Sequence, residues 1–231
     1  MDFTDLPADA GMITPSSGVS HPLLPRGEER LAAIAPCFSH REDTGSRKAP
    51  DEGGAYVVSA ERGDDVMARE ALLDRAMGPS RRRKSSEKLR RGRRPSEGLD
   101  FVAKDLDGRL LGTVRLWDVR AGEGGPTALL LGPLAVDPTV KSAGIGSALM
   151  RHAIAEAARL GHRAILLVGD VPYYRRFGFS SEKTGKLAMP GPYERDRFLA
   201  LELVEGALDG ASGVLKASGR KAKPALMARA A

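Results

Sequence analysis

One stretch decides the fold of this chain: Leu129-Leu-Leu-Gly-Pro-Leu-Ala-Val-Asp-Pro-Thr-Val-Lys-Ser-Ala-Gly-Ile-Gly-Ser-Ala-Leu-Met150. Its first part, Leu129 to Val136, is apolar and branched and too short for a helix, which predicts a buried strand that Asp137-Pro138 ends. From Ile145 the apolar spacing becomes helical, and Gly161 is a plausible C-terminal stop. The expected apolar stripe consists of Ile145, Leu149, Ala153, Ala157 and Leu160.

The loop between this strand and this helix has the composition of an anion site. Glycines at a helix N-terminus let a phosphate approach free N–H groups at the positive end of the helix dipole. A Walker A loop is a poor match, because Gly146 is followed by Ser147-Ala148 instead of Lys-Ser/Thr. A dinucleotide fingerprint is equally poor, because seven residues separate Val136 from Gly144. Taken alone, Gly144 and Gly146 fit a helix start without a ligand about as well.

The pattern basic-x-x-Gly-x-Gly at Lys141, Gly144 and Gly146 resembles motif A of the GNAT N-acetyltransferase superfamily. The resemblance implies that loop amides hold the pyrophosphate of acetyl-coenzyme A. It also implies that the edge of the preceding strand pairs with the pantetheine arm. Lys141 departs from the usual Arg or Gln, keeping the charge but losing the planar fork. The cofactor-binding positions implied are Leu134, Ala135, Val136, Lys141, Ser142, Ala143, Gly144, Ile145, Gly146 and Ser147.

A second element, Tyr173-Tyr-Arg-Arg-Phe-Gly-Phe179, resembles the Tyr-x-x-x-Gly-Phe pattern of the same superfamily. Tyr174, Gly178 and Phe179 fall on that pattern, and the paired tyrosines resemble a branch of predicted bacterial N-acetyltransferases. A phenol with a pKa of about 10 is protonated at neutral pH and can donate to a departing thiolate. We therefore predict Tyr174 as the catalytic residue. For Tyr173 we favour packing, with its hydroxyl at the surface.

The rest of the chain is predicted as an α/β (α+β) domain with a mixed sheet, because hairpins are antiparallel and the strand–helix–strand crossover is parallel. The GNAT resemblance covers roughly residues 55–205 and implies splayed strands flanked by helices. Residues 1–54 read as a disordered extension, and 206–231 as a turn or strand with a basic tail. Asp64-Asp65 is expected to cap a helix that Gly78-Pro79 ends.

Composition limits which metal sites, compartments and partners can be expected. The chain has 231 residues with a single cysteine, Cys37, and four histidines without ligand partners at metal spacing, so we expect no metal site. No apolar run approaches the ~18 residues that span a bilayer, and the acidic N-terminus does not read as a secretory signal. We therefore expect a cytoplasmic enzyme that has no membrane partner. Its acceptor is a small-molecule or protein amine, and a homodimer is left open.

One basic run, residues 81–94, has nine basic residues and one acid, within a net charge of +6. It is expected to form a polar helix or loop with a solvated face. Without aromatic residues it offers no stacking platform for bases, so nucleic acid is disfavoured as a partner. Nucleic-acid binding and a coenzyme A-binding regulatory role remain the alternatives. The general base is not identified: Asp118 and Asp170 are candidates for which strand-end capping is favoured, and Asp137 lies near the predicted loop.

Overall fold

The computed structural model describes residues 55–140 and 143–222. The predicted N-terminal extension, Lys141, Ser142 and most of the predicted tail lie outside these residues. The described elements are, in chain order, β1 (Tyr56–Ala60), α1 (Asp65–Met77), η1 (Pro79–Arg83), α2 (Ser85–Arg90), β2 (Asp100–Asp105), β3 (Leu110–Arg120), β4 (Thr127–Val136), η2 (Pro138–Val140), α3 (Ile145–Arg159), β5 (Ala164–Val168), α4 (Val171–Arg175), η3 (Glu182–Thr184), β6 (Leu187–Ala188), η4 (Arg195–Arg197), β7 (Phe198–Glu202), β8 (Gly213–Val214) and β9 (Lys216–Ala217).

The main sheet is mixed, as predicted, with the strand order β1-β2-β3-β4-β5-β7 and β9 added beside β3. All pairs along this order are antiparallel except β4 with β5, which are parallel and joined through α3. A parallel pair needs a crossover connection, and α3 supplies it. The predicted combination of antiparallel hairpins with one parallel strand–helix–strand crossover is confirmed.

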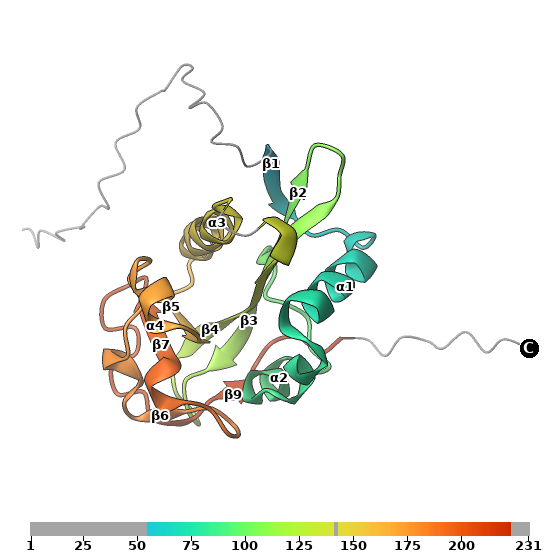
Figure 1. The fold of residues 1–231 in the computed structure, drawn as a ribbon. Helices are drawn as coiled ribbons and strands as arrows, with labels where there is room; N and C mark the ends of the chain where they lie inside the picture. The colour runs from blue at the N-terminus through green and yellow to red at the C-terminus, as the bar shows by residue number, and fades with distance from the viewer. Residues whose placement is uncertain (1–54, 141–142, 223–231) are drawn as a thin grey trace, which may run out of the picture. The chain divides into compact units, whose positions relative to one another are not determined.

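Helices cover both faces of the sheet, with α3 on one side and α1 and α2 on the other (Figure 1). Alternation along β2 decides which residue faces which helix. Phe101 and Ala103 belong to the core beneath α3, whereas Val102 packs with Leu72 of α1. The same alternation in β4 directs Leu129 and Leu131 toward α3 and Leu130 toward the opposite face.

Helix α3 forms as predicted because its apolar stripe is buried against the sheet. Ile145, Leu149, Ala153 and Ala157 are each at most 2% exposed. The prediction is wrong for Leu160, which is 40% exposed because the helix ends at Arg159 and Leu160 caps it. Gly161 follows in the left-handed region, with φ of 81°, as a helix stop requires.

One other local prediction needs correction, and one short strand was missed. Asp64 is the N-cap of α1 but makes no side-chain capping bond. The carboxylate of its neighbour Asp65 instead accepts a hydrogen bond from the N–H of Arg62 at 2.9 Å and forms an ion pair with Lys104 at 2.6 Å. The two-residue strands β8 and β9 lie in the range 206–231, where a turn or strand was expected, whereas β6 was not predicted; β9 pairs with Val119 and Arg120.

Candidate functional site

Strands β4 and β5 pair over a short register and then separate. Their aligned residues are Leu129 with Ile165 and Leu130 with Leu166. On its other side β4 stays paired with β3, where Leu134, Ala135 and Val136 lie opposite Val114, Thr113 and Gly112. Backbone groups of a strand alternate between its two sides, so beyond Leu130 half of those on β4 face the gap left by β5. The predicted splay is therefore present at the predicted strand edge.

The N-terminus of α3 follows this edge. Gly144 is its N-cap in the left-handed conformation, with φ of 75°. The first bond of the helix ladder runs from the N–H of Ala148 to the carbonyl of Gly144 at 3.0 Å. The N–H groups of Ile145, Gly146 and Ser147 precede that bond, as they do at any helix start. Ala143 and Gly144 lie just before the helix, and Gly144 is exposed.

Asp137 fixes the start of this loop. Its carboxylate is buried and accepts hydrogen bonds from the N–H and hydroxyl of Thr139, at 3.0 and 2.8 Å. Its other oxygen accepts from Arg75 at 3.0 Å and Arg109 at 3.2 Å, which ties the loop to α1 and to the start of β3. The N–H of Thr139, followed by the other donors, holds the pKa of Asp137 well below its usual range. Asp137 is therefore a structural anion in the free protein.

Tyr174 lies on the other side of the splay, at the end of α4. Its ring covers Gly169, so closely that a Cβ atom at Gly169 would lie 2.1 Å from Cε2 of the ring. Phe179 packs edge-on against the same ring, with the centroids 6.0 Å apart. Burial raises the pKa of Tyr174 to about 12, and Tyr173 and Asp170 act in the same direction. Sequence reasoning missed Gly169, whose role depends on where the ring lies.

Tyr173 points to a different place. Its hydroxyl would be 2.8 Å from a Cβ atom at Gly146, so it lies against the first turn of α3. The guanidinium of Arg176 lies over its ring, 4.3 Å from the centroid. The two tyrosines pack edge to face, 4.9 Å apart. Of the two, Tyr174 is the one that lines the cavity described next.

A cavity of about 450 Å³ extends from the splay to α1 and α2. Among the described residues, its lining includes Leu131–Leu134, Val168 and Tyr174 near the splay, seven Lys and Arg side chains, and the carboxylates of Glu70 and Glu87. The predicted candidates Asp118 and Asp170 are not among its lining residues, and Asp118 accepts instead from the hydroxyl of Ser96 at 2.7 Å. His152 packs its ring against Phe101, with centroids 4.6 Å apart.

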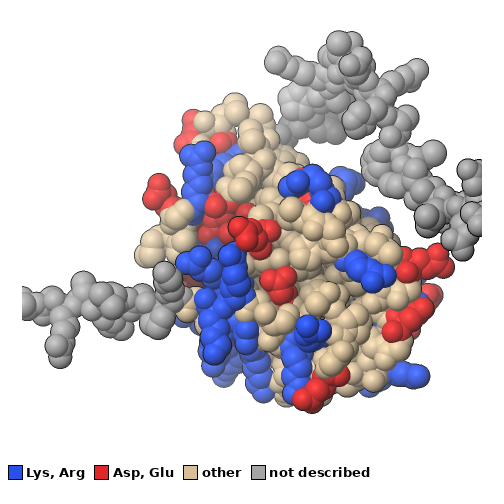
Figure 2. Space-filling model, turned by 180° about the vertical axis from the view of Figure 1, so that it is seen from behind, with Lys and Arg blue, Asp and Glu red and all other residues tan. Residues whose placement is uncertain are grey.

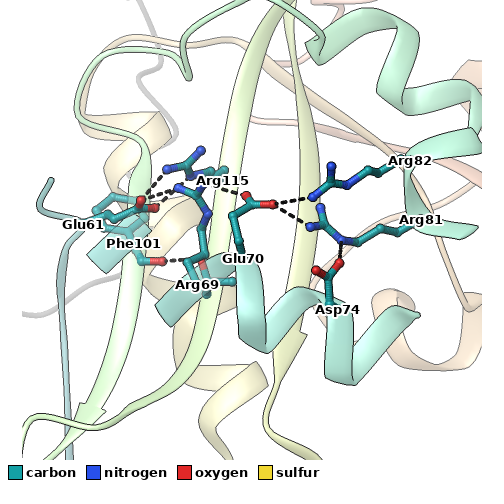
Figure 3. Close-up of polar contacts among 9 residues, drawn as sticks. Glu61, Arg69, Glu70, Asp74, Arg81, Arg82, Phe101 and Arg115 are labelled. Atoms are coloured by element: carbon teal, nitrogen blue, oxygen red, sulfur yellow. Dashed lines mark hydrogen bonds and ion pairs between the residues drawn. The ribbon is translucent and has the colours of Figure 1, made fainter. Parts of the chain in front are cut away.

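Carboxylates hold much of this positive charge in place (Figure 3). Glu61 is 2% exposed and binds both Arg69 and Arg115. Glu70 receives Arg69 at 2.7 Å and Arg81 from the opposite side. Burial raises the pKa of Glu61 although Arg69 opposes it, whereas hydrogen bonds from Arg81 and Arg69 outweigh burial and lower the pKa of Glu70.

The basic run therefore differs from the solvated surface that its sequence suggested. It forms η1 and α2, and Leu89 is 3% exposed in the core. Arg81 is bound by Glu70 and Asp74, and Arg93 donates to the carbonyl of Gly219. Other side chains of the run remain on the surface, and Figure 2 shows Lys and Arg gathered on the part of this face that lies over α2.

The family model that matches this chain is the acetyltransferase (GNAT) family, over residues 67–179. This range contains most of α1, the splayed strands, α3 and Tyr174. The part of the chain that spans residues 67–179 belongs to the GNAT family. It is an acetyl-coenzyme A-dependent N-acetyltransferase by this membership, and its mixed sheet with helices is the GNAT fold.

Relatives of this GNAT chain include the uncharacterized N-acetyltransferase YhbS of Escherichia coli K12. The two are 27% identical over 118 residues, which is 51% of this chain and 71% of YhbS. The crystal structure of E. coli YhbS in complex with CoA is similar at a TM-score of 0.59 and 25% identity, covering 71% of this chain and 89% of that one. A GNAT acetyltransferase from Brucella melitensis in complex with acetyl-CoA has a TM-score of 0.50 and 27% identity, over 64% and 88% of the chains.

Two further properties of the GNAT domain concern the described residues. None of the helices in residues 55–140 and 143–222 is long and apolar enough to cross a membrane. The same residues contain no group of three His, Cys, Asp or Glu side chains that could hold a metal ion.

Replacing Asp137 with alanine is expected to lower the free energy of unfolding at pH 7 by about 2–4 kcal/mol, because a buried acceptor of four hydrogen bonds is lost. The folded-state pKa of Asp137 is depressed, so its contribution is present above about pH 4 and lost as the pH falls. Urea denaturation of both proteins at pH 7 and pH 3 should show the difference shrinking in acid.

The matched control for this change is Asp209→Ala, which removes a carboxylate that is 69% exposed and bound to Lys183. A surface pair contributes about 1 kcal/mol or less, so this variant should stay close to the wild type. Equal losses in the two variants would contradict the anchoring role of Asp137.

Proposed function

We propose that this protein transfers the acetyl group of acetyl-coenzyme A to a primary amine of a small molecule or protein by direct attack within a ternary complex. The observation that carries the proposal is a single cavity that extends from the splay of β4 and β5 to the charged side chains beside α1 and α2. It gives an amine a route to the strand edge on which the donor would lie.

The residues around α3 fit a coenzyme A molecule. A pyrophosphate needs N–H donors at a helix start, and Ile145, Gly146 and Ser147 occupy that position. It also needs close approach to the backbone, which Gly144 and Gly146 allow. The free edge of Leu134, Ala135 and Val136 can pair with an extended amide-containing arm. We propose these groups, with Ala143 and the predicted Lys141 and Ser142, as the cofactor site.

When bound, the coenzyme supplies an acetyl thioester, which an uncharged amine can attack directly. Tyr174 is proposed to donate its O–H to the departing sulfur. Its pKa of about 12 keeps it protonated at all physiological pH values. Complete transfer to a thiolate whose pKa is about 8.5 would be uphill by about 5 kcal/mol, so hydrogen bonding to the developing charge is its main contribution.

Loss of a proton from the incoming amine is favoured by the charge of the cavity. The carboxylates that line it, Glu70 and Glu87, are both bound to arginines. Surrounding cations disfavour an ammonium group and lower its pKa, which raises the fraction of neutral nucleophile. On this proposal the amine gives its proton to water, and no dedicated carboxylate base is required.

The test is release of free thiol from acetyl-coenzyme A across a panel of amines, with calorimetry of acetyl-coenzyme A binding. We expect stoichiometric, saturable binding and turnover with at least one class of amine. Failure of both measurements would refute the proposal. Binding without turnover on any amine would favour the coenzyme A-binding regulatory alternative. DNA retention that weakens steeply with salt would favour nucleic-acid binding by the exposed part of residues 81–94.

A further inference from the structure

Arg90 has an unusual position among the cations of the cavity. Its side chain is 10% exposed, and its Nε atom is buried without a hydrogen-bond partner among the residues that the structure describes. Its Nη2 atom contacts Glu87 at 3.2 Å and the hydroxyl of Ser86 at 3.3 Å. Burial lowers the pKa of Arg90, which Glu87 opposes. Arg90 is therefore a buried guanidinium group whose hydrogen-bonding capacity is mostly unused within the described residues.

The guanidinium groups of Arg69 and Arg115, which line the same cavity, are each bound at two nitrogens by carboxylates. The Nε atom of Arg69 is also buried without a partner among the described residues, but Arg69 gives one terminal nitrogen to Glu61 and the other to Glu70. Arg115 gives two nitrogens to Glu61, through Nε and Nη2. These arginines are held by carboxylates of the protein itself. Arg90 differs because its hydrogen bonds and ion pair within the described part of the chain are confined to Nη2, although it lines the same cavity.

The cavity also carries an excess of positive charge, which supports the binding of an anion. Seven Lys and Arg side chains and two carboxylates, Glu70 and Glu87, line it. Glu61 and Asp74 bind arginines of the cavity without lining it. When their two negative charges are counted as well, the described residues still carry more positive than negative charges at the cavity. Buried charges are normally paired, so an anion that enters the cavity would gain charge-assisted hydrogen bonds at little further cost.

Arg90 lies close to the reacting end of the cavity. Its Nη1 atom is 3.8 Å from where a Cβ atom of Gly132 would be. Gly132 belongs to β4 just beyond Leu130, the last residue that is aligned with β5. An anion on Arg90 would therefore be held beside the splay, in the cavity that Tyr174 also lines.

We propose that the acceptor is a small amine that also carries an oxyanion, a carboxylate or a phosphonate, and that Arg90 binds this group while the amine faces the splay. This inference rests on the proposed function, since it names the acceptor class of the same site. A cavity of about 450 Å³ matches a molecule of small-ligand size.

The first experiment needs no variant of the protein. Acetyl transfer is measured to β-alanine and 6-aminohexanoate, to their neutral carboxamides, and to 2-aminoethylphosphonate, with rates expressed per concentration of unprotonated amine. We expect the acids to exceed their amides in kcat/KM by about 10- to 100-fold. The phosphonate arm decides which oxyanion is preferred. Calorimetric titration of the same compounds into the protein with bound coenzyme A measures the preference without turnover.

The second experiment compares Arg90→Gln with Arg83→Gln. Both changes remove one positive charge from the same segment, but Arg83 is exposed and does not line the cavity. Arg90→Gln should raise KM for the acidic amines by about 10- to 100-fold, leave KM for the amides unchanged, and remove the preference. Arg83→Gln should keep it. Thermal melting establishes that both variants fold, and the wild-type comparison stands if either does not.

Equal kcat/KM and affinity for acids and amides would overturn the inference, as would a preference that Arg90→Gln retains. If acetyl-coenzyme A binds but no acidic amine binds or reacts, the acceptor class is wrong while the proposed function stands. If acetyl-coenzyme A does not bind either, the proposed function itself fails.

Discussion

Tyr174→Phe is expected to lower kcat by about 100- to 1,000-fold while changing the affinity for acetyl-coenzyme A little. The substitution removes one hydroxyl and keeps the ring that covers Gly169 and packs against Phe179. The loss falls on kcat because the hydroxyl interacts most strongly with charge that develops on the departing sulfur, and deleting one such donor typically has this effect. Steady-state kinetics with calorimetry of the coenzyme separates the two quantities.

The control for this substitution is Tyr173→Phe. The hydroxyl of Tyr173 lies by Gly146 at the start of α3, away from the cavity lining. We expect its removal to leave kcat within a few-fold of the wild type. A greater loss of kcat in Tyr173→Phe than in Tyr174→Phe would reverse the assignment of the two tyrosines.

The pH profile gives an independent check on Tyr174. Its pKa of about 12 means that the donating form is complete below that value and is lost as the pH rises through it. Activity should therefore rise as the acceptor amine loses its proton and show no fall caused by Tyr174 up to about pH 10. The rising limb should survive in Tyr174→Phe. A falling limb near pH 9 that disappears in this variant would contradict the assigned pKa.

Gly169→Ala should reproduce most of this kinetic defect without touching the hydroxyl. The added Cβ would overlap the ring at 2.1 Å from Cε2, so the ring must leave its position. Adding Gly169→Ala to Tyr174→Phe should then lower kcat little further, because both changes remove the same interaction.

The parts of the site that the sequence predicts share one property: they follow from order along the chain. The change from strand to helix spacing around Asp137 and Gly144 is local, and β4 and α3 form where it places them. Tyr174 came from a motif rather than from periodicity. Its side chain lies in the splay because Gly169, five residues earlier, leaves room for the ring.

What the sequence could not supply depends on partners brought together by the fold. The basic run reads as surface because nothing near Arg90 in the sequence shows that its side chain is enclosed. The enclosure comes from β4, more than forty residues later, where Gly132 approaches its guanidinium. Asp137 likewise meets Arg75 from 62 residues away, through the packing of α1 near the end of β4. A two-residue strand such as β9 has too few residues to show any periodicity.

Gly146→Val should abolish measurable binding of acetyl-coenzyme A, a loss of at least about 100-fold in affinity, with the fold retained. Gly146 is the second residue of α3, and its backbone must stay open for a phosphate to reach the first-turn N–H groups. The added side chain would fill that approach. It would also meet the hydroxyl of Tyr173, which lies 2.8 Å from the Cβ position.

These two effects of the valine can be separated. In a Tyr173→Phe background the clash with the hydroxyl is removed, while the approach to the helix N-terminus stays blocked. If Gly146→Val abolishes binding in both backgrounds, the blocked approach is the cause, as the proposed pyrophosphate site requires. Recovery of binding in the Tyr173→Phe background would assign the loss to displacement of Tyr173. Gly185→Val is the matched control, because no atom of the described residues beyond its chain neighbours lies within 4 Å of its Cβ position, and it should bind acetyl-coenzyme A like the wild type.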